Sequence, residues 1–293
     1  MPLTSTTRHE APGRAARRHF DSYLFDLDGT IYLGADLLPG AAELVATLRA
    51  QGARVLFVSN NPTRSPQDYA DKLTCLGIPT GHEDVYTSLV ATTAWVRKHA
   101  PGSTVFPISE QPLVDALVAA GCTISDDPEA IDLVVASYDR SFDYRKLQVA
   151  FDTLFVHGRA RFVATNPDRF CPFPGGRGEP DCASVVAAIT AATGVACEAV
   201  FGKPDPAFLE IIAAETGLDP ATTVMVGDRL STDVAFAHAT GMTSALVLTG
   251  ETDRATALRT PAAQAPTLLL ERVDDLLQPA GHLWDSARRE VRA

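Results

Sequence analysis

The sequence predicts an α/β protein: a doubly wound parallel sheet into which a second α/β domain is inserted. Apolar strand-like runs alternate with amphipathic helix-like runs, which is typical of a parallel sheet covered by helices on both faces. Several of these strands end directly in polar side chains, as at Asp26, Ser59 and Asp228. Between residues 101 and 197 the alternation continues without such polar ends, so we expect the inserted domain there.

The first strand-like run, Tyr23-Leu24-Phe25, leads directly into Asp26-Leu27-Asp28-Gly29-Thr30. A continuous apolar run is typical of a strand that is buried on both faces. Side chains i and i+2 of an extended chain point the same way, so Asp26 and Asp28 should project together beyond the strand. Ligands of open parallel sheets bind at this edge, which makes the pair a candidate catalytic site. Solvated turn carboxylates would explain such a short match equally well.

The other elements follow from the same periodicities in chain order. Before the insertion we expect helices at 39–52, 66–76 and 89–99 and strands at 54–61 and 85–88. Inside it we expect strands at 104–108, 133–137 and 161–165, helices at 112–120, 144–156 and 182–193, and a loop rich in proline and glycine at 166–180. After it we expect helices at 207–216 and 234–240 and strands at 223–228, 243–248 and, at the sheet edge, 267–270.

The predicted domains follow from this order of elements. Residues 20–100 and 198–280 form the doubly wound core, and residues 101–197 form the inserted domain. Residues 1–19 contain several arginines and few apolar residues, which favours a disordered tail over a transit peptide. Residues 281–293 are charged and are predicted to be a mobile tail.

Composition excludes several classes of partner. Apolar residues make up 46% of the 293 residues and charged residues 21%, as in ordinary globular proteins. The net charge of −11 argues against nucleic acid or an anionic membrane surface as the partner. No run of eighteen apolar residues occurs, so we expect no membrane helix. The five cysteines are scattered without a Cys-x-x-Cys pair, which favours reduced thiols and a cytoplasmic location.

Four separated motifs carry a resemblance to a known family. They are Asp26-x-Asp28-Gly29-Thr30, Ser59-Asn60-Asn61, Gly202-Lys203-Pro204 and Gly227-Asp228-x-x-x-x-Asp233. In this order they resemble the haloacid dehalogenase superfamily of phosphohydrolases, over roughly residues 20–250. The resemblance implies a Rossmann-like core whose inserted domain is a cap of the larger α/β type, because the insertion lies between the second and third motifs.

Two further segments narrow the resemblance to the NagD-like branch. They are Val163-Ala164-Thr165-Asn166-Pro167-Asp168 and Gly227-Asp228-Arg229-Leu230-Ser231-Thr232-Asp233. Many members of that branch carry Pro-Gly-x-Gly before the last cap helix, whereas this chain has Gly178-Glu179-Pro180-Asp181. With the segment from Met242 to Gly250, this departure looks nearer the AraL type of sugar phosphatase.

The chemistry implied by the resemblance is phosphoryl transfer to a carboxylate. Asp26 would attack phosphorus and form an aspartyl-phosphate, which splits the hydrolysis into two easier steps. Asp28 would protonate the leaving alkoxide and later deprotonate water. Side chains of Asp26 and Asp228 and the main-chain carbonyl of Asp28 would hold Mg²⁺, a hard ion that prefers oxygen ligands.

The remaining motif residues would support this reaction. Ser59 would bind the phosphoryl oxygens and Lys203 would offset negative charge, while Asp233 would orient the water ligands of the metal or Lys203. Simpler interpretations stay open: Ser59 and Asn60 as turn caps, Lys203 as an exposed loop lysine, and Asp233 as an acid at a helix N-terminus.

Substrate selection is expected in the inserted domain. The resemblance points to the loop 167–178 as the part that faces the leaving group, and an ordinary proline-rich surface loop is the alternative. The candidate substrate-binding residues are Asn60, Asn61, Asn166, Arg169, Phe170, Cys171 and Phe173.

The function predicted from all these features is a Mg²⁺-dependent phosphatase for a small phosphorylated metabolite, either a sugar phosphate or a nucleoside monophosphate. The alternatives are a non-catalytic regulator that binds a phosphorylated metabolite and a phosphomutase on the same core. Relatives of this type often form a homodimer through the cap.

Overall fold

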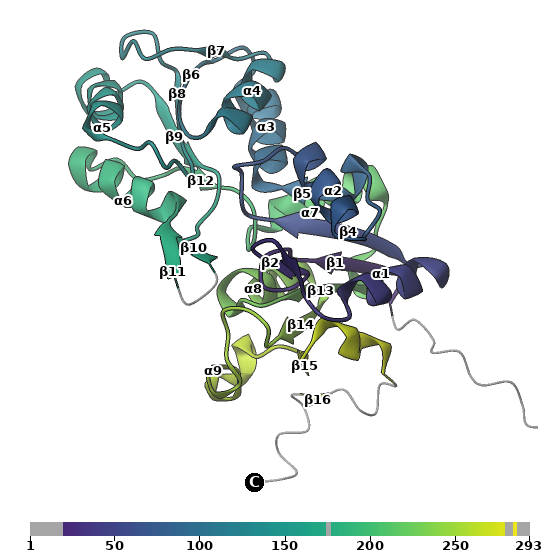
Figure 1. Cartoon of the computed structure of the whole chain (residues 1–293). Coiled ribbons are helices and arrows are strands. Elements are labelled where there is room, and N and C mark those ends of the chain that lie inside the picture. The colour runs from purple at the N-terminus through teal and green to yellow at the C-terminus, as the bar shows by residue number, and fades with distance from the viewer. Residues whose placement is uncertain (1–19, 174–176, 279–283, 286–293) are drawn as a thin grey trace, which may run out of the picture.

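The computed structural model describes residues 20–173, 177–278 and 284–285. Two parallel sheets form two domains, and the second domain is inserted between the first and last parts of the core (Figure 1). This confirms the predicted fold class. The predicted tails at 1–19 and 281–293 lie outside the described residues, apart from Trp284–Asp285, which form a strand.

The core sheet has the strand order β16-β15-β14-β13-β1-β4-β5. Its strands pair in parallel except for β16, which runs antiparallel to β15. The strands are β1 (Ser22–Phe25), β4 (Arg54–Ser59), β5 (Val85–Thr87), β13 (Thr223–Gly227), β14 (Thr243–Val247), β15 (Leu268–Leu270) and β16 (Trp284–Asp285). The strand expected at the edge, 267–270, is therefore β15 and is internal, because β16 pairs outside it.

Helices cover both faces of the core sheet. Tyr23 and Phe25 of β1 pack into a core with α1 (Ala41–Ala50) and α2 (Pro66–Cys75). Leu24 points to the opposite face, as expected for a strand. The helices packed on that face are α3 (Ser88–His99), α7 (Pro206–Thr216) and α8 (Ala235–Thr240). Burial on both faces explains why the central strands are continuously apolar.

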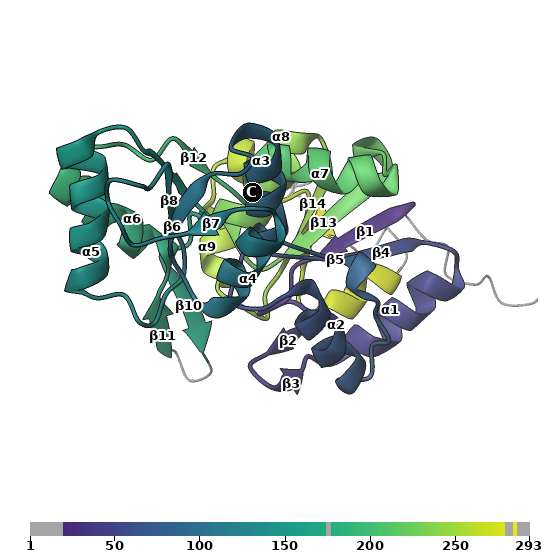
Figure 2. The ribbon, with the colours of Figure 1, turned by 90° about the horizontal axis from the view of Figure 1, so that it is seen from above.

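The cap is a five-stranded parallel sheet in the order β12-β9-β8-β6-β7. Its strands are β6 (Thr104–Ile108), β7 (Thr123–Ile124), β8 (Leu133–Ala136), β9 (Arg161–Ala164) and β12 (Ala199–Val200). Helices α5 (Tyr144–Phe151) and α6 (Cys182–Thr193) pack on one face. Helices α4 (Gln111–Ala119) and α3 pack on the other (Figure 2). Their buried residues belong to the same apolar cluster as α7 and α8, so this cluster continues from core to cap. The cap boundary at residue 197 remains a prediction, and the second sheet extends to β12.

One segment differs from its predicted structure in a way that matters for the site. The stretch 166–180, expected to be a loop, contains an antiparallel hairpin, β10 (Phe170–Phe173) and β11 (Arg177–Pro180). Each strand of this ribbon has a free edge, where proline is tolerated because no N–H is needed. Its proline and glycine content therefore led to the prediction of a loop instead of two strands.

The remaining elements are short or local. The segments Asp152–His157, after α5, and Leu230–Val234, before α8, are π-helical, so the predicted helices at 144–156 and 234–240 are irregular. Besides the hairpin, the elements that the sequence did not predict are β7, β12, β16, β2 (Tyr32–Leu33), β3 (Asp36–Leu37), α9 (Arg254–Arg259) and the 3₁₀ turns His82–Asp84, Pro220–Thr222, Ala262–Gln264 and Val273–Leu277. Within the described ranges, no helix combines the length and apolar character needed to cross a bilayer.

Candidate active site

Three neighbouring strands deliver the motif residues to one edge of the core sheet. Strand β1 lies between β13 and β4, and its last residue, Phe25, is in register with Val226 and Phe57. Asp26 follows β1, and Asp228 follows β13, while Ser59 ends β4. The carboxyl ends of parallel strands meet at the same edge, which brings motifs more than a hundred residues apart into one place.

Lys203 lies at the centre of this edge and is 1% exposed. Its Nζ donates hydrogen bonds to Asp26 Oδ1 at 2.5 Å, Asp233 Oδ1 at 2.7 Å and the main-chain oxygen of Val58 at 3.0 Å. Burial alone would lower the pKa of Lys203, but the carboxylates of Asp233 and Asp26 outweigh burial and raise it. The lysine is therefore a buried cation, and the interpretation as an exposed loop lysine is wrong.

Three carboxylates surround this cation. Oxygens of Asp26, Asp228 and Asp233 lie within 4.8 Å of one another, close enough to hold a metal ion. Burial, together with the charges of Asp233 and Asp228, raises the pKa of Asp26 although Lys203 opposes the shift. Burial and the charge of Asp233 raise the pKa of Asp228 to about 7. A second cation beside these groups would reverse both shifts.

The three carboxylates differ in how many of their oxygens are already bonded. Asp233 Oδ1 accepts from Lys203, and Asp233 Oδ2 accepts from the main-chain N–H of Arg229 at 3.0 Å. Asp228 Oδ2 accepts from the N–H of Glu251 at 2.6 Å. Asp228 Oδ1 is buried and has no hydrogen-bond partner among the residues that the structure describes. An orphaned buried carboxylate oxygen is costly, so Asp228 fits a cation ligand better than Asp233 does.

Two glycines make room for these carboxylates. A Cβ added to Gly227 would overlap the carboxylate of Asp233, and a Cβ added to Gly250 would overlap that of Asp228. Any side chain at either position would therefore displace an acid of the cluster. This explains the glycine that precedes Asp228 in the fourth motif.

Asp28 lies in the same pocket as Asp26. Burial raises the pKa of Asp28, and the positive charges of Lys72, Arg229 and Arg64 oppose that shift. A raised pKa favours the protonated form of the carboxyl group, which a general acid needs.

In the second motif, Ser59 lines the pocket and Asn60 bonds to the main chain of Lys203. Ser59 Oγ accepts from the N–H of Asn61 at 3.2 Å. The Asn60 side chain binds the Lys203 main chain twice, from its N–H at 2.7 Å and to its carbonyl at 2.8 Å. Asn60 Nδ2 also donates to Asp168 Oδ1 at 3.3 Å. These bonds favour a positioning role for Asn60, because they occupy both ends of its amide.

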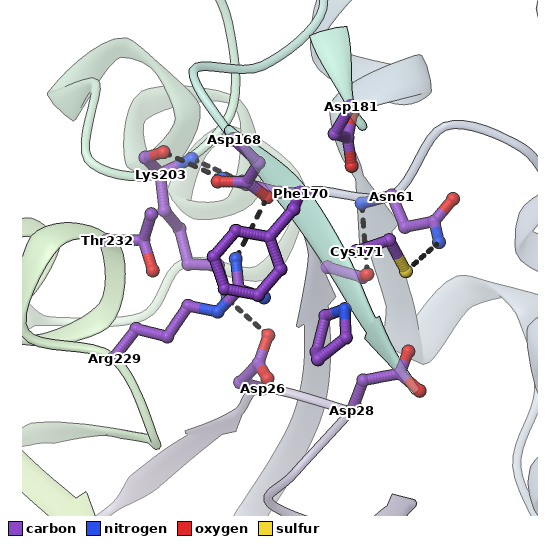
Figure 3. Close-up of a pocket in the computed structure, with 13 residues that line it drawn as sticks. Asp26, Asp28, Asn61, Asp168, Phe170, Cys171, Asp181, Lys203, Arg229 and Thr232 are labelled. Carbon is purple, nitrogen blue, oxygen red and sulfur yellow. Dashed lines mark hydrogen bonds and ion pairs between the residues drawn. The ribbon is translucent and has the colours of Figure 1, made fainter. Parts of the chain in front are cut away.

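The cap completes the pocket. Figure 3 shows Phe170 and Cys171 of the hairpin on the cap side, across from Asp26 and Asp28 of the core. The pocket encloses about 40 Å³, far below the roughly 300–1,000 Å³ of typical small-molecule sites. A sugar-sized group cannot enter this space unless the cap moves away from the core.

Most of the predicted site residues lie together, and three cap candidates lie apart: Asn166, Arg169 and Phe173, the last of which lines a different pocket with Asp228. The pocket is lined by Asp26, Asp28, Ser59, Asn60, Asn61, Phe170 and Lys203. Asn166 is fully buried beneath it and accepts from the N–H of Asp168 at 2.9 Å. Arg169 lines a separate groove with Arg177. The structure thus does not bring Asn166, Arg169 or Phe173 into this pocket.

Sequence reasoning assigned no individual role to five other residues that line the pocket. These are Asp168, Pro172, Asp181, Arg229 and Thr232. Asp168 and Arg229 belong to the segments that carry the NagD-like resemblance, and each adjoins or nearly adjoins a residue that was assigned a role. Their position in the sequence next to assigned residues was the signal that could have identified them as site residues.

Comparisons with known proteins agree with this architecture. A family model described as haloacid dehalogenase-like hydrolase matches residues 23–123, and one described as HAD-hydrolase-like matches residues 200–276. An acid sugar phosphatase of Staphylococcus aureus is 35% identical over 233 residues, covering 80% of this chain and 88% of the relative. A 5′-nucleotidase of Bacillus subtilis is 37% identical over 236 residues, covering 80% and 90%.

Solved structures extend the likeness to the whole fold. A 4-nitrophenylphosphatase from Thermotoga maritima superposes with a TM-score of 0.83 at 32% identity, covering 91% of this chain and 99% of that one. A glycerol phosphate phosphatase from Mycobacterium tuberculosis, in complex with magnesium, has a TM-score of 0.81 at 31% identity, covering 91% and 79%.

A doubly wound core, an inserted α/β cap and an acid–lysine cluster between them define a class of capped phosphohydrolases. The chain belongs to the haloacid dehalogenase-like hydrolases and, among these, to the NagD-type phosphatases. The predicted family is therefore confirmed, while the nearer likeness to the AraL type stays a prediction.

Proposed function

We propose that this protein is a Mg²⁺-dependent phosphatase that hydrolyses a small phosphomonoester through an aspartyl-phosphate on Asp26. The observation that carries the proposal is the position of Asp26. Its Oδ1 lies 2.5 Å from Lys203 Nζ in a pocket that also contains Asp28, and carboxylate oxygens of Asp26 and Asp228 lie within 4.8 Å of each other. A nucleophile, a proton carrier and a charge-neutralising cation thus share one pocket.

In the first step, an oxygen of Asp26 forms a bond to phosphorus while the bond from phosphorus to the leaving oxygen breaks. Asp28 donates its proton to that leaving oxygen, and its raised pKa favours the protonated form needed here. Lys203 offsets negative charge on Asp26 and on the phosphoryl oxygens. Ser59, at the end of β4, binds a phosphoryl oxygen through its hydroxyl.

In the second step, water attacks the phosphorus of the aspartyl-phosphate. Asp28, now a carboxylate, accepts a proton from this water as the bond between phosphorus and Asp26 breaks. Inorganic phosphate leaves, and Asp26 and Asp28 return to their starting states. The closed cap excludes bulk water during transfer to Asp26, which strengthens each electrostatic contact in the pocket.

The donor set fits a hard divalent cation. Asp26 and Asp228 would hold Mg²⁺ with their side chains and Asp28 with its main-chain carbonyl, while Asp233 orients Lys203. When bound, the cation supplies charge neutralisation to the phosphoryl group. The pocket needs this neutralisation, because two like charges 4 Å apart repel by about 4 kcal/mol at an effective dielectric of 20. A single lysine cannot offset three carboxylates and a phosphate dianion.

The substrate class we propose is a sugar phosphate or a nucleoside monophosphate. The support is that relatives of similar length are an acid sugar phosphatase and a 5′-nucleotidase. Phe170 lines the pocket where the leaving group would lie, and Arg169, on the other side of the hairpin, would act only after the cap has moved. We further propose a cytoplasmic location, supported by the five free cysteines, and a homodimer formed through the cap.

Hydrolysis of p-nitrophenyl phosphate by the purified protein tests the proposal. We expect turnover with Mg²⁺, loss of turnover in excess chelator and recovery when Mg²⁺ is restored. Asp26→Asn is the control and should be inactive while it remains folded. Full activity in chelator would refute the metal requirement, and binding of phosphate without any turnover would favour the regulator. A panel of phosphomonoesters ranked by kcat/KM would then identify the substrate.

A further inference from the structure

A carboxylate of the cap reaches across to the core beside the catalytic pocket. Asp168 lies in the cap loop after β9, and its Oδ1 accepts from Asn60 Nδ2 of the core at 3.3 Å. Its Oδ2 lies 3.6 Å from Nη1 of Arg229, which follows β13 of the core. The side chains of Asp168 and Arg229 are only 11% and 15% exposed. Two core residues that follow different strands, Asn60 after β4 and Arg229 after β13, therefore hold one cap carboxylate. Figure 3 shows Asp168 and Arg229.

Both sides of this contact are fixed within their own domains. The N–H of Asp168 donates to Asn166 Oδ1 at 2.9 Å, and its carbonyl accepts from the N–H of Ala183 at the start of α6 at 3.0 Å. On the core side, Arg229 Nε pairs with Glu251 at 2.9 Å. The main chain of Asp168 and the side chain of Arg229 are thus each held within their own domain, so movement of the cap away from the core would separate them.

The contact also lies where it can control access to the pocket. The Arg229 guanidinium lies 5.7 Å from the centre of the Phe170 ring, on the hairpin that covers Asp26 and Asp28. The enclosed space is too small for a sugar-sized leaving group, so substrate entry and product release both require opening. A contact that stabilises only the closed state sets how often the pocket is covered.

We propose that Asp168 is a positioning residue that latches the cap closed over the active site through Asn60 and Arg229. Asp168 touches neither Asp26 nor Lys203, so its effect on the reaction passes through the closed state of the cap. This proposal rests on the proposed function, because closure of the cap would prepare the pocket for phosphoryl transfer.

Cys171 offers a direct measure of opening. It lies on the hairpin and lines the pocket, and burial raises the pKa of its thiol to about 12. The raised pKa keeps the thiol protonated and lowers its reactivity while the cap covers it, and we expect both its exposure and its reactivity to increase when the cap opens. With Cys75 and Cys197 replaced by serine, the remaining cysteines besides Cys171 are buried. The rate of maleimide labelling then reports cap opening without any need for turnover.

In that background, we expect Asp168→Asn to raise the labelling rate of Cys171 about tenfold, because removing one partner of a largely desolvated charge pair is strongly felt. The matched control is Asp139→Asn. Asp139 is a fully buried cap aspartate paired with Lys146 at 2.6 Å, and both partners lie within the cap. The control should leave the labelling rate within about twofold. Equal acceleration by both variants, or no acceleration by Asp168→Asn, would overturn the latch.

A second variant replaces the core partner of Asp168 in this contact. Arg229→Gln should also accelerate labelling, and the acceleration in the double variant should fall below the product of the two single accelerations, because both variants remove the ion pair between Asp168 and Arg229. Additive effects would contradict the proposal.

A kinetic comparison adds a readout that a general loss of structure would not give. If the substrate complex is mostly closed, weakening closure in Asp168→Asn raises KM for p-nitrophenyl phosphate about tenfold with kcat nearly unchanged. A fall in kcat at constant KM would instead place Asp168 in the chemistry and overturn its role as a latch. The labelling result does not depend on turnover, so failure of the latch and failure of the phosphatase assignment are distinguishable.

Discussion

Replacing Lys203 by methionine would remove the buried cation and leave three carboxylates facing one another. Asp26 and Asp233 would each lose a hydrogen bond of 2.5–2.7 Å, and Asp228 lies within 4.8 Å of both. Removing one partner of a buried ion pair typically lowers the free energy of unfolding by about 3–5 kcal/mol. Because the acids can take up protons, we expect a loss of about 3 kcal/mol at pH 8 without metal.

The pH dependence of this loss has a definite sign. The pKa values of Asp26 and Asp228 are raised, the latter to about 7, so both acids are more fully protonated at pH 5 than at pH 8. Protonation relieves the repulsion, and the difference between Lys203→Met and wild type should shrink at pH 5. Added Mg²⁺ at pH 8 should recover part of the lost stability.

Urea unfolding in chelator at pH 5 and pH 8, repeated with Mg²⁺, measures these effects. Lys146→Met is the matched control, because Lys146 pairs with the buried Asp139 in the cap, far from the acid cluster in the sequence. It should lose stability without any response to Mg²⁺. A loss below about 0.5 kcal/mol in Lys203→Met at pH 8, or an equal loss at both pH values, would refute the reasoning.

Three further predictions concern neighbouring groups. Asp28→Asn should lower kcat by about 10²–10⁴ for alkyl phosphates but less for p-nitrophenyl phosphate, whose leaving group needs no proton; an equal fall for both would contradict the acid role. Gly227→Ala should displace the Asp233 carboxylate and reduce both activity and melting temperature, and calorimetry showing a wild-type melting temperature would contradict the predicted overlap. Burial raises the pKa of Asp181 to about 7. The protonated side chain is therefore compatible with the folded state, and its contribution to the free energy of unfolding is fully present below about pH 4 and is lost as the pH rises through 7. Asparagine can still serve as the N-cap residue of α6. Asp181→Asn should therefore be more stable than wild type at pH 8 by up to about 4 kcal/mol and should gain little stability at pH 4.

The sequence predicted the fold well wherever burial determines the pattern. Strands β1, β4 and β13 are buried on both faces, so their apolar runs mark them clearly, and their polar ends mark the edge of the sheet. The position of the cap followed from where those polar ends stop. The cap hairpin, by contrast, has little buried surface, and its exposed ribbon carries prolines and glycines that resemble those of a loop.

The acid–lysine cluster was predictable because its members lie at strand ends, whose relative positions the sheet imposes. The contacts that cross from cap to core were not. Whether Asp168 meets Arg229 depends on how two separately folded sheets dock, and no local periodicity encodes that orientation. For the same reason, Arg169 was expected beside the leaving group, whereas the structure places it just before β10, where it lines a different groove.

Trapping of the phosphorylated enzyme tests the central claim most directly. Rapid acid quench of the protein with Mg²⁺ and a substrate carrying ³²P in its phosphoryl group should yield covalent label within one turnover, sensitive to hydroxylamine as an acyl phosphate is. Peptide mapping should place that label on Asp26, and Asp26→Asn should take up none. Turnover without any trapped label, or label on a residue other than Asp26, would contradict the mechanism.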